Sequence, residues 1–533
     1  MPTLNWIGKD KVVSHHQDVP YRVLEHKYGF TADNGEQTKP TKSGNKIIHG
    51  DNLEALKSLL PEYEEKIKCI YIDPPYNTGN ESWVYNDNVN HPKIKKWLGE
   101  VVGKDGEDLT RHDKWLCMMY PRLQLLHKLL ADDGIIFISI DENEINNLRL
   151  VLNEVFGEHN FRGNISRATG TPTGQGNLRI ANEIDYIVVY AKTIKSEIKG
   201  LPFSEKDSKI YNQTDEKGRY LTRTLRKTGG EDKREDRPNM FYPITNPNGN
   251  DIYPLGPTNY ESRWRCAYST FLESEQKGLI EWKKNKKGVL QPFLKFYLEG
   301  RTKQVGNFWG DIEGNKKAST DVKAIFNDKV FDFPKPIELV TRCIQISANN
   351  DDIILDSFAG SGTTAHAVLN LNKQDGGNRK FILVEMEDYA NDITAERVKR
   401  VTKGFGSDTK KVEGTGGAFD FYELGLPLFD ENQNLNEEVG LTKIREYIWF
   451  SETRTSFTEP DAANYFLGKK EESAYYFIYE KDSLTTLDYD SLELIKTKGE
   501  QYVIYADNCL LPKDFMAKKN IIFKKIPRDI TRF

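Results

Sequence analysis

Apolar and polar residues alternate along the first part of the chain in a pattern that predicts strands and helices in turn. A short apolar segment at 45–51 precedes a helix-like segment at 53–60, and residues 67–72 form a nearly continuous apolar run. Leucine and methionine then recur at helical spacing over 115–130, and the apolar run 135–140 follows directly. Such runs are typical of buried strands, and a period near 3.6 is typical of helices packed on them. Together they predict β-α-β units and a parallel sheet.

The same pattern continues with a predicted helix at 144–155 and a strand at 184–190, and it returns later in the chain. There, predicted strands at 352–356 and 381–385 flank a helix that begins near residue 363. Between the two regions, clusters of Gly, Pro, Asn and Lys interrupt short aromatic segments, which indicates a mixed or β-rich inserted domain.

The predicted fold class is therefore α/β, with a doubly wound, mostly parallel sheet interrupted by an insertion. We expect five parts: an N-terminal extension (1–44), the first half of the α/β domain (45–196), the inserted domain (197–330), the second half of the α/β domain (331–404) and a C-terminal region (405–533).

The composition is that of a large protein without a membrane or disulfide signature. The chain has 533 residues and a formal net charge of −5, so a nucleic-acid surface has to be local. No run of eighteen apolar residues occurs, and the first residues lack the apolar core of a signal peptide, which predicts a cytoplasmic protein with no membrane segment. The five cysteines form no C-x-x-C pair, which argues against a zinc ribbon and a disulfide framework, and we predict no metal site.

The strand at 67–72 leads into the tetrapeptide Asp73-Pro74-Pro75-Tyr76, the most specific chemical signal in the chain. An exocyclic amine of a nucleobase is a poor nucleophile, because its lone pair is delocalised into the ring. The carboxylate of Asp73 and the backbone carbonyl of Pro74 would accept its two N–H groups, and consecutive prolines stiffen the loop that presents them. Tyr76 offers a face for a base swung out of a duplex. The tetrapeptide therefore predicts methylation of a nucleobase amine.

A glycine-rich turn, Asp356-Ser357-Phe358-Ala359-Gly360-Ser361-Gly362-Thr363-Thr364, follows the strand at 352–356. Glycines at such a place let the backbone approach a ligand closely, and a helix N-terminus favours its anionic end. The next strand ends in Glu385, where a carboxylate binds ribose hydroxyls in dinucleotide folds. The complete G-x-G-x-x-G pattern is absent. The turn therefore favours S-adenosylmethionine, which has ribose hydroxyls and a carboxylate but no phosphate.

Cations and aromatic residues are interleaved in the insert, a composition that suits phosphate contact and base stacking. The predicted DNA-binding residues are Arg223, Arg226, Lys227, Arg263 and Arg265. A solvated charged surface above ordinary core aromatics has the same composition, so both interpretations stay open at this point.

In this order, the motifs resemble those of the β-group amino methyltransferases, and most closely the modification subunits of type III restriction-modification systems. In that family a D-P-P-Y motif precedes an F-x-G-x-G motif and the target-recognition region lies between them, as residues 73–76 precede 358–362 here. The segments 5–9, 49–53, 118–123 and 333–336 also resemble family signatures. The resemblance implies a Rossmann-like methyltransferase fold with permuted motif order, in which the first half is catalytic, the second half binds the cofactor and the insert recognises the target.

The resemblance also implies roles for individual residues. Asp51 is similar to a family acid near the cofactor's adenine, Lys335 lies in the segment beside its methionine moiety, and Glu385 would bind its ribose. The implied catalytic residues are Asp73, Pro74, Pro75 and Tyr76, and the implied cofactor residues are Asp51, Lys335, Asp356, Phe358, Gly360, Gly362, Thr363 and Glu385.

Aspartate at the first motif position resembles adenine-specific members, so we expect a sequence-specific adenine-N6 methyltransferase acting on double-stranded DNA. The resemblance implies a homodimer. No G-x-x-x-x-G-K-[ST] loop occurs, so a separate restriction subunit would have to supply ATP-driven restriction. No Pro-Cys pair occurs either, which argues against methylation of a cytosine ring carbon. Three alternatives stay open: a solitary methyltransferase, a non-catalytic DNA specificity module on a methyltransferase scaffold, and an enzyme acting on RNA.

Overall fold

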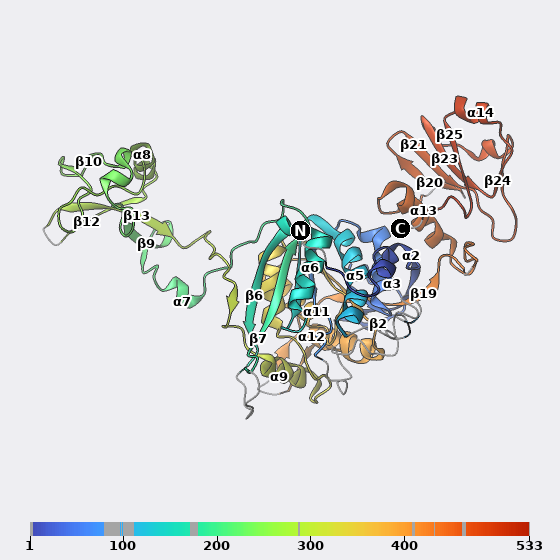
Figure 1. Cartoon of the computed structure of the whole chain (residues 1–533), viewed down its shortest axis with the longest axis horizontal. Coiled ribbons are helices and arrows are strands. Elements are labelled where there is room, and N and C mark those ends of the chain that lie inside the picture. Colours follow the sequence, from blue (N-terminus) through green and yellow to red (C-terminus); the bar gives the residue numbers. More distant parts are fainter. Residues whose placement is uncertain are drawn as a thin grey trace. The chain divides into compact units, whose positions relative to one another are not determined.

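A computed structural model gives the fold of the chain (Figure 1). It describes residues 4–78, 96, 99, 111–170, 180–285, 288–407, 411–430, 432–460 and 465–531. The chain divides into two compact units, which are described separately: the first comprises Met1–Ile198 and Gly306–Phe533, and the second comprises Lys199–Val305.

The first unit is built on a sheet of eleven described strands, in the order β14-β6-β7-β5-β4-β15-β16-β3-β19-β1-β2. The six strands from β5 to β19 run parallel, whereas β7 pairs antiparallel with β5 and β1 pairs antiparallel with β19. The strands are β1 (Arg22–Thr31), β2 (Gly35–Gln37), β3 (Lys46–His49), β4 (Ile67–Ile72), β5 (Leu130–Ile140), β6 (Phe161–Ala168), β7 (Ile184–Ala191), β14 (Phe308–Trp309), β15 (Ile353–Asp356), β16 (Lys380–Glu385) and β19 (Ala418–Pro427). The predicted α/β fold with a mostly parallel sheet is thereby confirmed.

Helices cover both faces of this sheet, as the residues of β4 illustrate. Ile70 and Ile72 belong to the large apolar cluster that includes α3 (Asn52–Tyr63), α5 (Arg111–Leu129) and α6 (Ile145–Phe156). Cys69 points to the opposite face, where it lies near Ser347 and Cys343 of α10 (Ile337–Ser347). Further helices α9 (Asn315–Phe326), α11 (Thr363–Asp375) and α12 (Glu396–Lys403) pack with α10 as a second group. Because side chains alternate along a strand, a strand that is apolar at every position is buried on both faces, which gives the doubly wound architecture.

The second unit has its own antiparallel sheet, in the order β12-β13-β9-β8, as expected for a β-rich insert. Its strands are β8 (Gln213–Asp215), β9 (Gly218–Thr224), β12 (Ile280–Lys284) and β13 (Leu290–Tyr297), and α8 (Tyr268–Gln276) accompanies them. A small core of Leu225, Ile244, Ile252, Trp264 and Phe271 holds the unit together.

The structure moves three of the domain boundaries expected from the sequence. The insert ends at Val305 rather than at residue 330, because β14 pairs with β6 in the sheet of the first unit. The segment 1–44 is not a separate extension, since β1 and β2 form one edge of that sheet. The expected C-terminal region begins too early at residue 405, because β19 lies between β3 and β1.

Beyond β19, α13 (Leu441–Thr453) packs against α3, and a four-stranded sheet follows in the order β20-β21-β23-β25. Its strands are β20 (Phe466–Lys470), β21 (Ser473–Phe477), β23 (Gln501–Ala506) and β25 (Ile521–Lys525). No helix in the described part of the chain is long and apolar enough to span a membrane.

Candidate active site

Four neighbouring parallel strands bring the predicted motifs to one edge of the sheet. Asp73 follows the last residue of β4, Asp356 is the last residue of β15, Glu385 is the last residue of β16, and Asp51 follows shortly after β3. These strands are adjacent and parallel, so their carboxyl ends meet at the same edge. Ligands of open α/β sheets bind at that edge.

The predicted catalytic acid, Asp73, is buried and paired with a lysine. Only 7% of Asp73 is exposed, and its Oδ2 accepts a hydrogen bond of 2.6 Å from Nζ of Lys335. Its other oxygen, Oδ1, is buried and has no hydrogen-bond partner within the described residues. Burial raises the pKa of Asp73, and the charge of Lys335 opposes that increase. One carboxylate oxygen is thus fixed by Lys335 while the other remains available as an acceptor.

Lys335 also contacts the predicted stacking residue. Its Nζ lies 4.6 Å from the centre of the Tyr76 ring, a geometry typical of a cation–π contact. The Tyr76 ring is half-buried, and its hydroxyl is buried without a hydrogen-bond partner in the described part of the chain. The sequence predicts that Lys335 lies beside the cofactor, and this stays a prediction. In the structure its ammonium group contacts the loop 73–77, while its backbone carbonyl accepts a hydrogen bond of 3.3 Å from Thr363 Oγ1 in the glycine-rich turn.

Arg167 and Asp185, which the sequence analysis did not single out, lie at the same edge. They face each other in the register of β6 and β7, and NH2 of Arg167 donates to Asp185 Oδ2 over 2.8 Å. Both are close enough to affect the pKa of Asp73 and of Tyr76. NH1 of Arg167 is buried and has no partner among the residues described. Only the strand register reveals this pair.

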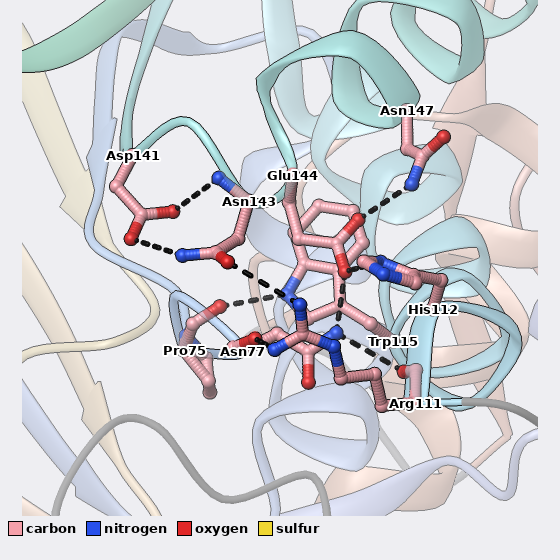
Figure 2. Close-up of polar contacts among 9 residues, drawn as sticks. All are labelled: Pro75, Asn77, Arg111, His112, Trp115, Asp141, Asn143, Glu144 and Asn147. Carbon is pink, nitrogen blue, oxygen red and sulfur yellow. Dashed lines mark hydrogen bonds and ion pairs between the residues drawn. The ribbon is translucent and has the colours of Figure 1, made fainter. Parts of the chain in front are cut away.

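The loop 73–77 is held from behind by α5, as Figure 2 shows. The indole Nε1 of Trp115 donates a hydrogen bond of 2.7 Å to the carbonyl oxygen of Pro75. This contact fixes the peptide between Pro75 and Tyr76, next to the Pro74 carbonyl that is the second predicted acceptor for the amine. The prolines and the buried indole therefore stabilise one loop conformation.

The glycine-rich turn requires glycine at two positions. Gly360 and Gly362 have φ values of +51° and +80°, in the left-handed region that favours glycine. A Cβ atom on Gly362 would lie 3.1 Å from the carbonyl oxygen of Thr394, so a side chain there would crowd the backbone. The amide of Gly360 donates a hydrogen bond of 2.7 Å to Oε2 of Glu385, which joins the turn to the next strand.

Two side chains of the segment after β16 support the same turn. Thr394 Oγ1 donates to the carbonyl of Gly360 over 2.6 Å, and NH1 of Arg397 donates to Ser361 Oγ over 2.7 Å and to Thr363 Oγ1 over 3.0 Å. Burial lowers the pKa of Arg397 to about 10. The sequence analysis missed both residues, because the motif ends well before them.

The two buried acids beside the turn differ in their contacts. Asp356 accepts hydrogen bonds from Thr364 Oγ1 at 2.5 Å and from the amide of Phe358 at 3.1 Å, so its carboxylate stabilises the turn itself. Glu385 accepts the amides of Gly360 and Glu387 on separate oxygens. Burial is the main cause that raises the pKa of each acid to about 7.

The segment around Asp51 packs against the turn. Oδ1 of Asp51 caps the N-terminus of α3 by accepting the amides of Leu53 and Glu54, at 2.9 and 3.2 Å. Asn52 Nδ2 donates to the carbonyl of Ser357 over 3.1 Å, and Arg122 Nε donates to Asn52 Oδ1 over 2.5 Å. Asp51 therefore has a structural role that would also place its second oxygen near a ligand at the edge.

The five cations predicted to bind DNA lie in the second unit, where chain pairing brings them together. The amide of Lys227 donates to the carbonyl of Arg263 over 2.8 Å, and the amide of Arg265 donates to the carbonyl of Leu225 over 2.9 Å. Arg223 is exposed. Burial, and after it the charges of the three neighbouring arginines, lowers the pKa of Arg265.

Two of these cations also hold the local loops. Arg263 is only 5% exposed, and its Nε donates to the carbonyl of Glu231 over 2.6 Å. Arg226 is half-buried and donates to Ser262 Oγ over 3.3 Å. The cluster is therefore partly exposed and partly structural.

The sequence matches the DNA methylase (N6_N4_Mtase) family over residues 67–396, a range that contains both the tetrapeptide 73–76 and the glycine-rich turn. It is 32% identical to the Mod subunit of the type III restriction-modification enzyme StyLTI of Salmonella typhimurium, over 80% of this chain and 66% of that protein. It is 31% identical to the EcoPI Mod subunit of Escherichia phage P1, over 75% and 68%, and 36% identical to the type II methyltransferase M.KpnI of Klebsiella pneumoniae, over 67% and 84%. The chain thus spans about two thirds of the length of these two Mod subunits. These matches confirm the family expected from the motifs, and the chain belongs to the DNA methylase family.

Proposed function

We propose that this chain transfers a methyl group from S-adenosylmethionine to the N6 amine of an adenine in DNA, as the modification subunit of a type III-like restriction-modification system. The observation that carries this proposal is the state of Asp73. It is a buried carboxylate with one oxygen fixed by Lys335 and the other without a partner among the described residues, at the sheet edge that also holds the glycine-rich turn and Glu385.

The residues of the catalytic loop account for the reaction of the amine. Oδ1 of Asp73 and the carbonyl of Pro74 accept the two N–H groups of the target amine, which orients its lone pair, and Asp73 takes up the proton that the amine loses. Tyr76 stacks on the base after it has left the duplex. The rigid prolines and the bond from Trp115 to Pro75 keep these groups in place, so little orientational freedom is lost at the moment of reaction.

The residues around the turn fit S-adenosylmethionine, which supplies an electrophilic sulfonium methyl group when bound. Glu385 accepts one amide on each oxygen and keeps further acceptor capacity for ribose hydroxyls. Gly360 and Gly362 leave the backbone of the turn open to close approach, and Ser357 Oγ is a buried polar atom without a partner in the described chain. We assign Phe358 and Thr363 to the methionine end and Asp51 to the adenine end.

We also assign contacts with DNA to the second unit. Three arginines lie close enough to Arg265 to lower its pKa, and a polyanion bound there relieves this repulsion. The exposed Arg223 is the clearest candidate for phosphate contact, whereas Arg263 acts through the loop that it holds.

Adenine and the type III system rest on two further arguments. The family covers amine methylation at both adenine N6 and cytosine N4, and aspartate in the first position of the tetrapeptide favours adenine. The relatives named as Mod subunits match most of this chain, which supports a modification subunit that works with a separate restriction subunit. The resemblance of the motifs adds the proposal that this subunit is a homodimer. Cytosine N4 is the second candidate.

Transfer of tritiated methyl groups from S-adenosylmethionine to unmethylated genomic DNA tests the proposal, with nucleoside analysis of the product. We expect label in N6-methyladenine and a loss of about 100- to 1,000-fold in kcat for Asp73→Ala, because a preorganised group at the reacting amine is removed. Asp133→Ala removes an exposed carboxylate near the start of β5, at the edge of the sheet opposite the site, and should keep full activity. Label in N4-methylcytosine would overturn the base assignment, and unchanged transfer by Asp73→Ala would overturn the site.

A further inference from the structure

A fully buried glutamate, Glu144, forms a hydrogen bond with Asn77, the residue that follows Tyr76 in the loop 73–77 (Figure 2). Oε1 of Glu144 accepts hydrogen bonds from Nδ2 of Asn77 and, at 2.6 Å, from Nδ1 of His112. Its Oε2 accepts Nδ2 of Asn147 over 2.8 Å. The carboxylate thus joins the catalytic loop to the start of α5 and to α6.

Asn77 is held through its backbone as well as its side chain. It comes directly after Tyr76 and has a φ of +58°, in the left-handed region that asparagine adopts more readily than most residues other than glycine. NH1 of Arg111 donates to its carbonyl over 2.7 Å, and Asn77 Nδ2 also donates to the carbonyl of Arg111 over 3.1 Å. NH2 of Arg111 in turn reaches Oδ1 of Asn143 over 3.3 Å. The end of the loop is therefore held in a left-handed conformation by surrounding groups.

The side chain of Glu144 does not cap its own helix. Glu144 occupies the N-cap position of α6, yet its carboxylate accepts no backbone amide of that helix, and its one bond to α6 comes from the side chain of Asn147. A carboxylate at this position commonly stabilises the helix by accepting its first free amides. Here it points to Asn77. Burying a carboxylate is costly unless hydrogen bonds compensate for the lost water, and Asn77, His112 and Asn147 supply those bonds.

We propose that Glu144 is a positioning residue for methyl transfer, which acts through Asn77 to hold Asp73 and Tyr76 in their reactive places. Glu144 itself touches neither the base nor the cofactor. This inference rests on the proposed function, because the loop it positions is the one assigned to the target amine.

The test combines Glu144→Gln, Asn77→Ala and the double variant, with Asn147→Ala as the matched control. Asn147 bonds the same carboxylate but lies on α6, outside the loop. We expect kcat for DNA methylation to fall by about 10- to 100-fold in each loop-side variant, while calorimetry shows unchanged binding of S-adenosylmethionine. The double variant should be no slower than the slower single variant, because both act on one contact. Asn147→Ala should lose less than about threefold.

A purely structural role would give a different pattern. Glu144→Gln would then lower Tm but keep kcat in the protein that remains folded, or the effects of Glu144→Gln and Asn77→Ala would multiply, and either result would overturn the proposal. If the wild type methylated no DNA, the proposed function would fail, and crystal structures would still decide this inference. We expect residues 73–77 of Glu144→Gln to be displaced or disordered with the sheet unchanged, and a loop that superimposes on the wild type would refute it.

Discussion

Replacing Lys335 by methionine removes the cation that contacts the catalytic acid and keeps an apolar side chain of similar length. In the structure, Nζ of Lys335 lies 2.6 Å from Oδ2 of Asp73 and 4.6 Å from the centre of the Tyr76 ring. Both partners are shielded, since only 11% of the lysine side chain and 10% of the aspartate side chain are exposed. Solvent therefore screens this ion pair weakly.

The size of the effect follows from that geometry. A hydrogen bond to a charged group contributes roughly 1.5–3 kcal/mol, and about 1.36 kcal/mol corresponds to a factor of ten in rate. We therefore expect kcat at neutral pH to fall by about 10- to 160-fold. The pKa of Asp73 should also rise further, because burial raises it and the charge of Lys335 is what opposes the increase. The ionised carboxylate is the active form, so activity is lost at low pH and recovers as the pH rises.

The assay is tritiated methyl transfer at saturating S-adenosylmethionine over a range of pH, with cofactor affinity measured by calorimetry. The acidic limb of the kcat profile should move to higher pH in Lys335→Met. Lys329→Met is the matched control, because Lys329 forms an exposed ion pair with Asp332 in the same segment. The reasoning is refuted if Lys335→Met keeps the wild-type kcat and acidic limb and only weakens cofactor binding, which would return Lys335 to a purely cofactor-binding role.

Three further outcomes are expected. Gly362→Ala should weaken cofactor binding at a strain cost of about 1–3 kcal/mol, because φ is +80° and the new Cβ would lie 3.1 Å from the carbonyl oxygen of Thr394. Gly376→Ala is the control: its φ is +69° but the space around it is open, so the cofactor affinity measured by calorimetry should not change. Arg223→Ala should lower the slope of log affinity for DNA against log salt by about 0.9 if the side chain contacts one phosphate, and an unchanged slope in fluorescence anisotropy would exclude that contact. Binding of S-adenosylmethionine should strengthen between about pH 6 and pH 8, because burial raises the pKa of Glu385 to about 7 and the ionised carboxylate accepts hydrogen bonds from the ribose hydroxyls. Glu385→Gln should flatten this pH dependence, and a flat wild-type profile would contradict the assignment.

The central fold was predictable because its signals are local. Each parallel strand of the site is an apolar run followed within a few residues by Asp, Glu or Gly, and the helices between the strands have a clear period. The tetrapeptide 73–76 and the turn 356–364 are continuous in sequence, so the residues that carry their chemistry could be named before the strands were placed in order. Parallel pairing then brings the ends of the strands to one edge without further information.

The contacts between distant segments could not be predicted in this way. Asp73 and Lys335 are 262 residues apart, and the sequence contains no sign that their side chains meet. The strand β19 lies between β3 and β1 and pairs antiparallel with β1, which is far from it in sequence. Hydrophobic periodicity alone does not specify such a pairing. Arg167 and Asp185 became visible through the pairing of β6 and β7. Local patterns define elements, whereas register and topology define which side chains share a site.

The electrostatics of the sheet edge suggest why the ligand there is a cation. Three buried acids, Asp73, Asp356 and Glu385, lie at neighbouring strand ends, and burial raises the pKa of each. The ammonium group of Lys335 balances the charge of Asp73. Asp356 and Glu385 have no such contacting cation among the described residues, and burial disfavours their ionised forms. A positively charged sulfonium therefore binds more favourably at this edge than a neutral thioether of the same shape. Loss of the methyl group removes that positive charge, so the acids that favour binding of the donor also weaken retention of the product.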